Sequence, residues 1–278
     1  CIVTGTHGDE LEGQFVCYSI AKILRENKEL LDGTVEIYPA LNPLGMDSIL
    51  RGIPGFDLDM NRIFPGDPEG TMAENAAYAI IEDLKGADLV IDIHSSNIFL
   101  REVPQVRINV QTANKLIHFA KMLNMDFIWV HESATVLQST LAHSLNSIDT
   151  PCVVVEMGVG MRINHDICNQ LVKGILNLLN QIGMWKKNIG EVKTPIISKE
   201  QEVEFINAEV SGVFITEIHN GKSVNRGDEL GNIVNSLTGE ILSSVKSPTA
   251  GYLFTIRAYP IVYEGSLIAR IHSADKSV

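Results

Sequence analysis

The first two-thirds of the chain alternates short apolar runs with longer segments of helical periodicity. Five runs rich in Val and Ile are expected to form strands: 2–4, 35–38, 89–93, 127–130 and 152–155. Five further segments are expected to form helices: 12–31, 72–85, 112–125, 138–147 and 164–185. In the last segment, Ile167, Leu171, Ile175, Leu178 and Ile182 share one face of an amphipathic helix. Apolar strands alternating with helices predict an α/β fold, with a mostly parallel or mixed sheet sandwiched by helices.

The pattern changes after Lys193, where helical periodicity ends and short β-rich runs alternate with turn signals such as Asn220-Gly221 and Thr238-Gly239. Two stretches within this part resemble each other, 221–233 and 259–271, and each contains Val-x-x-Gly before a strand-like run. We therefore predict two domains: an α/β domain over residues 1–193, and a small, internally symmetric all-β sandwich over residues 194–278.

Composition and charge narrow the classes of partner. The chain has 278 residues, 45% of them hydrophobic and 20% charged, which is typical of a globular protein. No apolar run approaches the ~18 residues of a membrane span. The net charge of −12 argues against nucleic acid and anionic membranes, because both attract clustered Lys and Arg. An anionic small molecule is still compatible with a local group of arginines.

The four cysteines are the one feature of the sequence that bears on the cellular compartment of the protein. Cys1, Cys17, Cys152 and Cys168 show no Cys-x-x-Cys spacing and lie among apolar neighbours. This pattern predicts free, buried thiols in a reducing compartment, and therefore a cytoplasmic protein. The sequence leaves homo-oligomerisation open.

Polar residues follow three of the predicted strands. The first strand leads into His7 and Glu10, the strand at 89–93 leads into His94, and the strand at 152–155 leads into Glu156. One His-x-x-Glu pair carries no weight by itself. Ligands of such folds, however, bind beyond the carboxyl ends of the strands, so we expect these four side chains to share one crevice.

Two histidines and one carboxylate that leave a fourth position open for water form a known catalytic zinc site. On a strand, Asp92 points the same way as His94 and can accept the second N–H of that imidazole. The competing interpretations are a solvated turn for His7 and Glu10, a buried core histidine for His94, and a salt bridge at a sheet edge for Glu156. Among the remaining histidines, only His131 is of interest.

A second group of polar residues lies between Asn42 and Gly66, in a segment rich in Pro, Gly and Asn. A long loop of this kind is usually functional when it is ordered. Its residues Arg51, Asn61 and Arg62 suit an anion, because a guanidinium binds a carboxylate through two parallel hydrogen bonds. The competing interpretation is that both arginines form surface salt bridges.

Taken together, these motifs resemble the succinylglutamate desuccinylase/aspartoacylase family, which belongs to the wider zinc carboxypeptidase group. The matching motifs are His7-Gly-Asp-Glu10, Asn42-Pro43 with Arg51 downstream, Asn61-Arg62-x-Phe-Pro-Gly66, Asp92-x-His94 and Val155-Glu156-x-Gly158. They span residues 1–185 in order and spacing.

The resemblance implies a role for each residue. It implies one Zn²⁺ per chain, held by His7, Glu10 and His94, and hydrolysis of an anionic N-acyl amino acid to a carboxylate and a free amine. Glu156 would then be the general base and acid. Arg51 would stabilise the oxyanion, while Asn61 and Arg62 would bind the carboxylate of the substrate.

The β-rich part resembles the carboxy-terminal domain of bacterial members of the family, which is related to lipoyl and biotinyl sandwiches. A carrier domain presents a modified lysine on a hairpin, where this chain has Asn235-Ser-Leu-Thr-Gly-Glu240. We therefore expect a domain that packs against or covers the pocket, and not a carrier.

Two other functions compete with the deacylase. A zinc carboxypeptidase would use the same metal, base and carboxylate grip, but the short catalytic part with an appended β domain argues against peptide access. A catalytically silent metal-dependent binding protein would keep the fold and the ion, but it would have no need of Glu156 as a base.

Overall fold

The computed structural model describes residues 1–56, 58–132 and 138–276. Each helix predicted from periodicity is present but shorter than predicted: α1 (Glu12–Glu26), α3 (Met72–Leu84), α4 (Ala113–Met122), α5 (Leu141–Ser147) and α6 (His165–Gln181). Local signals fix the starts of several helices. Thr71 and Glu74 form a reciprocal capping box on α3, and the Asn164 side chain accepts from the Asp166 backbone N–H at the start of α6. Short 3₁₀ turns accompany them, among them η1 (Lys28–Leu30), η2 (Met60–Arg62), η4 (Glu200–Glu202) and η5 (Ala274–Lys276).

Four of the predicted strands form a parallel sheet in the order β2–β1–β3–β6. Their bounds are Ile37–Tyr38 for β2, Ile2–Thr4 for β1, Val90–Ser95 for β3 and Cys152–Gly158 for β6. Because the four strands are parallel, their carboxyl ends meet at one edge, where the polar residues of the sequence motifs emerge.

The ten-residue strand β4 (Leu100–Asn109) was missed by the sequence analysis. It reads Leu-Arg-Glu-Val-Pro-Gln-Val-Arg-Ile-Asn, and a proline inside a run with three charged residues argues against a central strand. β4 nevertheless lies beside β6, antiparallel to it, with a bulge between Glu102 and Gln105. Glu102 faces Gly158 and Gln105 faces Glu156, so three steps on β4 match two on β6.

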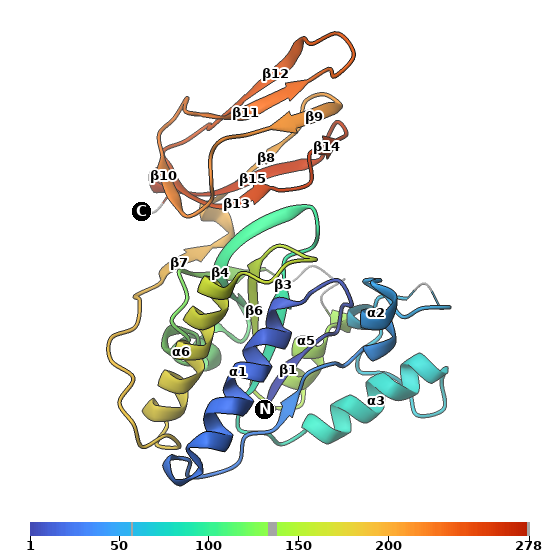
Figure 1. Cartoon of the computed structure of the whole chain (residues 1–278), viewed down its shortest axis with the longest axis vertical. Coiled ribbons are helices and arrows are strands. Elements are labelled where there is room, and N and C mark those ends of the chain that lie inside the picture. Colours follow the sequence, from blue (N-terminus) through green and yellow to red (C-terminus); the bar gives the residue numbers. More distant parts are fainter. Residues whose placement is uncertain (57, 133–137, 277–278) are drawn as a thin grey trace.

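β4 is also the strand at which the sheet divides. Its first residues, Leu100–Glu102, pair with β13 (Gly251–Arg257), whereas Gln105–Asn109 pair with β5 (Phe127–His131), which in turn pairs with β7 (Ile196–Lys199). Strands before and after residue 193 therefore belong to one 11-stranded mixed sheet. Figure 1 shows the β-rich part stacked above the α/β part, with β4 and β13 between them. The division into domains at residue 193 stays a prediction.

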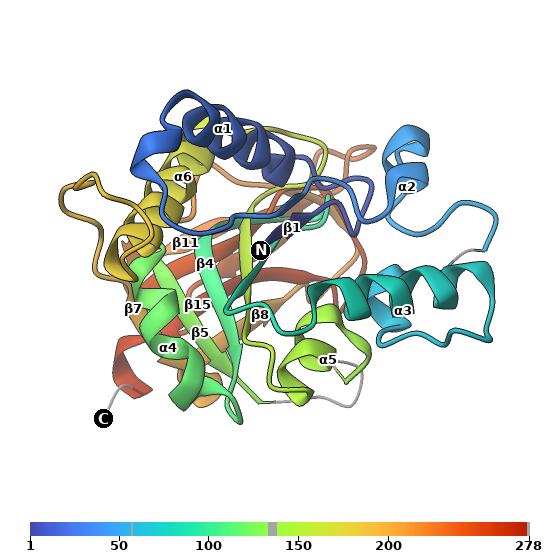
Figure 2. The same ribbon diagram turned by 90° about the horizontal axis from the view of Figure 1, so that it is seen from below.

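Helices cover both faces of the α/β part, as predicted. α1, α4 and α6 pack on one face, over a core that includes Ile91, Ile93, Val153 and Val155. α3 and α5 pack on the other face, over the alternate residues of the same strands, such as Val90. Figure 2 shows the two helical layers on either side of the sheet. The prediction of an α/β sheet sandwiched by helices is confirmed.

The carboxy-terminal part is a β sandwich, also as predicted. A four-stranded sheet has the order β12 (Ile241–Lys246), β11 (Glu229–Val234), β9 (Gly212–Ile215) and β14 (Ile261–Val262). Through a shared apolar core, it packs on four strands of the large sheet: β8 (Val203–Asn207), β10 (Lys222–Val224), β13 and β15 (Leu267–Ser273).

The two similar stretches of sequence account for an internal symmetry of this sandwich. The chain passes from the large sheet to the small sheet between β10 and β11, and from the small sheet to the large sheet between β14 and β15. Asn235–Glu240, where a carrier would present its lysine, is the turn between β11 and β12.

The long loop between Asn42 and Gly66 is partly helical, which the sequence analysis did not anticipate. It contains α2 (Pro43–Ser48) and η2. Asn42 caps α2 by accepting from the Gly45 N–H at 3.0 Å, and Pro43 occupies the first helical position. The same asparagine donates to the Gly52 carbonyl at 3.1 Å, which fixes the loop as it returns toward the sheet edge.

Two further expectations concern thiols and membranes. Cys17, Cys152 and Cys168 are buried free thiols, as predicted, whereas Cys1 is only half-buried. Over the described ranges, every helix is either too short or too polar to cross a bilayer.

Candidate metal centre and active site

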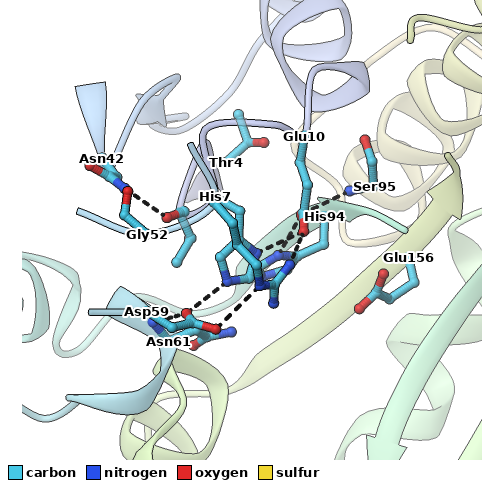
Figure 3. A network of polar contacts seen from close by, with 12 residues as sticks. Thr4, His7, Glu10, Asn42, Gly52, Asp59, Asn61, His94, Ser95 and Glu156 are labelled. Atoms are coloured by element: carbon cyan, nitrogen blue, oxygen red, sulfur yellow. Dashed lines mark hydrogen bonds and ion pairs between the residues drawn. The ribbon is translucent and has the colours of Figure 1, made fainter. Parts of the chain in front are cut away.

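Three side chains from separate parts of the chain meet at the carboxyl edge of the sheet. The Glu10 carboxylate lies between two imidazoles, with Oε1 2.8 Å from His7 Nδ1 and Oε2 2.9 Å from His94 Nδ1. The ring centroids of the two histidines are 5.1 Å apart, and all three residues are buried. Figure 3 shows both rings directed at the same carboxylate. The sequence motifs therefore converge on one point.

A tight turn after β1 places His7 and Glu10. The turn packs directly against α2: a Cβ at Gly8 would lie 2.1 Å from the Gly45 carbonyl carbon, and the Gly8 N–H donates to the Leu50 carbonyl at 3.1 Å. Only glycine permits this approach of two backbones. On the other side, the Ser95 N–H donates to Glu10 Oε2 at 3.2 Å and ties the turn to the end of β3.

Each imidazole has a second carboxylate at the nitrogen that faces away from Glu10. Asp92 Oδ1 lies 3.1 Å from His94 Nε2, close enough for an ion pair but without the geometry of the hydrogen bond expected from their spacing on one strand. Asp59 Oδ1 lies 2.9 Å from His7 Nε2 and also accepts the Asn61 N–H at 2.8 Å. Carboxylates in this position orient a histidine ligand and raise its basicity. Asp59 was not among the predicted site residues, and its one signal in the sequence is its place two residues before the Asn61-Arg62 motif.

The charges of this cluster are balanced within a buried space. Burial opposes the charged form of His94, yet Asp92 and Glu10 raise its pKa well above the ordinary value. The pKa of His7 is also raised, because Glu10 and Asp59 outweigh its burial. Burial likewise opposes ionisation of Glu10, but the two histidines hold its pKa below the usual range. The site therefore favours positive charge between two Nδ1 atoms and a carboxylate.

This donor set fits a divalent cation. The ligand atoms offered by His7, Glu10 and His94 all lie within 4.8 Å of one another. A cation bound to both Nδ1 atoms and to Glu10 would replace the protons that these groups share. Two imidazoles and one carboxylate are the ligands that catalytic zinc uses, and the remaining coordination position is left for solvent.

Glu156 lies on β6 next to this cluster, and its backbone is the register partner of His94 on β3. Figure 3 shows its carboxylate turned toward the histidines. Oε1 accepts from Arg107 Nη1 at 3.2 Å. Burial raises the pKa of Glu156, and the nearby Arg107 only partly opposes that effect. A carboxylate with a raised pKa beside a metal site is suited to take up and return a proton during a reaction.

The three remaining predicted site residues line the same cavity but differ in their hydrogen bonds and in their exposure to solvent. Arg51 Nη1 donates to Glu10 Oε1 at 3.0 Å, and its Nε lies 3.4 Å from Asp59. Asn61 Oδ1 accepts the Leu141 N–H at 2.9 Å, at the start of α5. Arg62 is exposed and bonds to the Asn61 carbonyl at 2.7 Å. Arg51 thus bonds directly to the His7–Glu10–His94 cluster although its side chain is 39% exposed, whereas Arg62 lies at the rim.

The cavity has a volume of about 530 Å³, within the range of sites for small molecules. It contains every residue predicted for the site and also His131, Arg107 and Arg270. Arg107 and Arg270 were missed by the sequence analysis. Arg107 belongs to the unpredicted strand β4, and Arg270 comes from β15 in the carboxy-terminal sandwich, far from the motifs in sequence.

The fold and site together define a class. A mixed α/β sheet that brings two histidines and two glutamates to its carboxyl edge offers the donor set of a metal site beside a cavity of small-molecule size. Residues 1–182 match the family model described as the succinylglutamate desuccinylase/aspartoacylase catalytic domain. The chain belongs to this family, which confirms the resemblance found in the sequence motifs.

Individual relatives agree with this assignment. Over 101 residues, 36% of this chain and 29% of the relative, the chain is 35% identical to the N-α-acetyl-L-2,4-diaminobutyric acid deacetylase of Halomonas elongata. Its fold is similar to a succinylglutamate desuccinylase from Silicibacter sp. TM1040 (TM-score 0.85, 22% identity, 98% of this chain and 84% of that chain). It is also similar to the product-bound ectoine utilization protein EutE (DoeB) from Ruegeria pomeroyi (TM-score 0.82, 23% identity, the same coverage). At these identities the two structures show the fold alone.

The metal centre makes a testable prediction. The purified protein should bind one zinc ion per chain, and His94→Ala should abolish stoichiometric binding because it removes one of three ligands. Asp59→Asn should keep the site but weaken zinc affinity by ~10–100-fold, since it removes only the partner of His7 Nε2. Both effects can be measured by metal analysis and competition with a chromogenic chelator.

His219→Ala is the matched control, because His219 is exposed in the carboxy-terminal part and does not line the cavity. Full zinc loading in His94→Ala would show that the three side chains are not the ligands.

Proposed function

We propose that this protein is a zinc-dependent hydrolase that releases the acyl group from an N-acyl amino acid. The observation that carries the proposal is the meeting of His7, Glu10 and His94 with the half-buried carboxylate of Glu156 in one cavity. Membership of the desuccinylase/aspartoacylase family and a relative named as a deacetylase support the same reaction class.

His7, Glu10 and His94 would hold the ion, because their donor atoms all lie within 4.8 Å of one another. Zinc bound in such a site acts as a Lewis acid, which polarises an amide carbonyl and lowers the pKa of water from 15.7 toward about 7. Asp59 and Asp92 would keep the two imidazoles in the orientation that this coordination needs.

Glu156 would move the proton that the hydrolysis must transfer. Its carboxylate takes a proton from the attacking water as the new carbon–oxygen bond forms. It then delivers that proton to the amide nitrogen as the carbon–nitrogen bond breaks, so the products are a carboxylate and a free amine. The raised pKa of the Glu156 carboxyl suits both halves of this cycle.

Arg51 would stabilise the negative charge that develops on the carbonyl oxygen, since its guanidinium reaches the Glu10 carboxylate at the metal site. Asn61 and Arg62 would bind the carboxylate of the amino acid at the rim of the cavity, where Arg62 is exposed to solvent. A guanidinium at the rim offers an incoming anion a local positive charge, although the chain as a whole carries a net charge of −12.

Replacing Glu156 tests the role of the proton carrier. Glu156→Gln should keep its zinc but lose at least ~100-fold in kcat, because the amide cannot accept a proton. In the parent, the raised pKa of Glu156 means that the protonated form persists above pH 4.5, so kcat/KM should fall as pH decreases through that raised pKa. A mutant that retains activity within a few-fold of the parent would refute this role.

The two arginines should differ in the kinetic constant that they affect. Arg51→Ala should lower kcat by ~10²–10³, as expected for the loss of one oxyanion donor. Arg62→Ala should chiefly raise KM, because the Arg62 guanidinium binds the substrate and the transition state equally. Steady-state kinetics on one substrate suffices. If both mutants change KM only, the assigned roles are wrong.

The reaction itself is tested by an amine-release assay on acetyl-, succinyl- and peptidyl-amino acids, with and without a chelator. The proposal predicts hydrolysis of one or more N-acyl amino acids that stops when zinc is removed. Preference for the peptidyl substrates would indicate a carboxypeptidase. Tight zinc binding with slow ligand release and no turnover would indicate a binding protein.

A further inference from the structure

Building on the proposed function, we propose that Arg270, from strand β15 of the carboxy-terminal sandwich, is a positioning residue for Glu156, acting through Glu102 and Arg107. The carboxy-terminal part would then be a component of the active site and not only a cover over it. The four side chains form a continuous ion-paired chain that crosses the junction between the two parts of the molecule.

Short contacts connect each step of this chain. Arg270 Nη1 donates to Glu102 Oε1 at 2.7 Å. Arg107 Nη2 donates to the same carboxylate, at 2.6 Å to Oε2 and 2.8 Å to Oε1. Gln105 Nε2 adds a fourth bond to Glu102 at 2.8 Å. Arg107 then donates to Glu156 Oε1 through its other terminal nitrogen, Nη1, at 3.2 Å.

Strand register explains why residues from such distant segments meet. Glu102 on β4 is the partner of Thr255 on β13, and Thr255 is the partner of Arg270 on β15. The three side chains therefore share one face of the joined sheet. Thr255 is small and buried, so the long Arg270 side chain can extend across it to Glu102.

The bulge between Glu102 and Gln105 completes this geometry. In a regular strand, Glu102 and Arg107 would point to opposite faces, because they are five residues apart. The extra residue between Glu102 and Gln105 returns Glu102 to the face that carries Arg107 and Glu156. The irregularity that hid β4 in the sequence thus allows this ion-paired chain to form.

Both guanidinium groups make cation–π contacts with the Trp129 ring. Arg107 lies 5.4 Å and Arg270 5.3 Å from the centroid of the Trp129 ring, and Arg270 also lies 5.6 Å from the Phe205 ring. Trp129 belongs to an apolar cluster at the junction, together with residues of β4, β8 and β13. Cation–π contacts in such a partly desolvated place fix the planes of both guanidinium groups.

The charges around Glu156 indicate what Arg270 does there. Charged groups from five parts of the chain act on the Glu156 carboxylate. They are Arg107 and Glu102 of β4, His94 of β3, Glu10 in the turn after β1, Arg51 in the loop and Arg270 of β15. Glu102 competes with Glu156 for Arg107. Arg270 neutralises part of the Glu102 charge and so leaves Nη1 of Arg107 free to donate to Glu156.

This competition predicts opposite effects of two substitutions. Without Arg270, Glu102 would draw Arg107 away, so Glu156 would bind its proton more tightly. Without the Glu102 charge, Arg107 and Arg270 would both favour ionised Glu156. Arg270→Gln should therefore move the acid limb of kcat/KM up by roughly 0.5–1 pH unit, and Glu102→Gln should move it down by a similar amount. Arg270→Gln should lower kcat with KM within about threefold, as expected for a mispositioned base.

A second measurement does not depend on turnover. In metal-free protein labelled with δ-¹³C glutamate, the Glu156 carboxyl signal can be assigned by its loss in Glu156→Gln, and its titration followed by NMR in each variant. The matched control is Arg257→Gln. Arg257 is also an arginine of the carboxy-terminal part, stacked 5.2 Å from the Phe99 ring, but it bonds only to backbone carbonyls.

The outcomes separate the inference from the proposed function. The inference is supported if the Glu156 titration shifts in opposite directions in Arg270→Gln and Glu102→Gln. It also requires that the titration does not shift in Arg257→Gln and stays close to that of the parent in Arg270→Lys. An unmoved Glu156 signal, or shifts of the same sign that follow the loss of stability, would overturn it. If the parent hydrolyses no N-acyl amino acid while the NMR shifts are opposite, the proposed function fails and the coupling stands.

Discussion

The active site depends on one buried carboxylate, that of Glu10, which is shared by two imidazoles from different strand ends. Burial alone would keep this acid neutral, yet the charges of His94 and His7 hold its pKa below the usual range. Such a group is stable in the interior only if positive charge lies between it and the histidines. The turn after β1, the end of β3 and the Asp59 segment are all arranged around that requirement.

Much of this arrangement could be predicted from the sequence. The parallel strands β1, β3 and β6 were visible as apolar runs, and the residues after them could meet only at the carboxyl edge of one sheet. Asp92 followed from its spacing to His94. These inferences succeeded because they rest on strand periodicity and chain direction, which are local properties of the sequence.

The rest could not be predicted, because it depends on long-range pairing. β4 contains a proline and three charged residues, and its character as a central strand is visible only once β6, β13 and β5 surround it. Asp59 resembles any other loop carboxylate until α2 brings its segment back to His7. Arg270 is separated from Glu102 by 168 positions and meets it only through the register of β13 and β15.

X-ray diffraction from zinc-loaded crystals, measured on both sides of the zinc absorption edge, tests the central claim most directly. The account predicts one anomalous peak per chain, bound by the Nδ1 atoms of His7 and His94 and by the Glu10 carboxylate, with the Glu156 carboxylate facing the open side of the ion. A peak at another site, or zinc bound while both Nδ1 atoms still contact only Glu10, would contradict it.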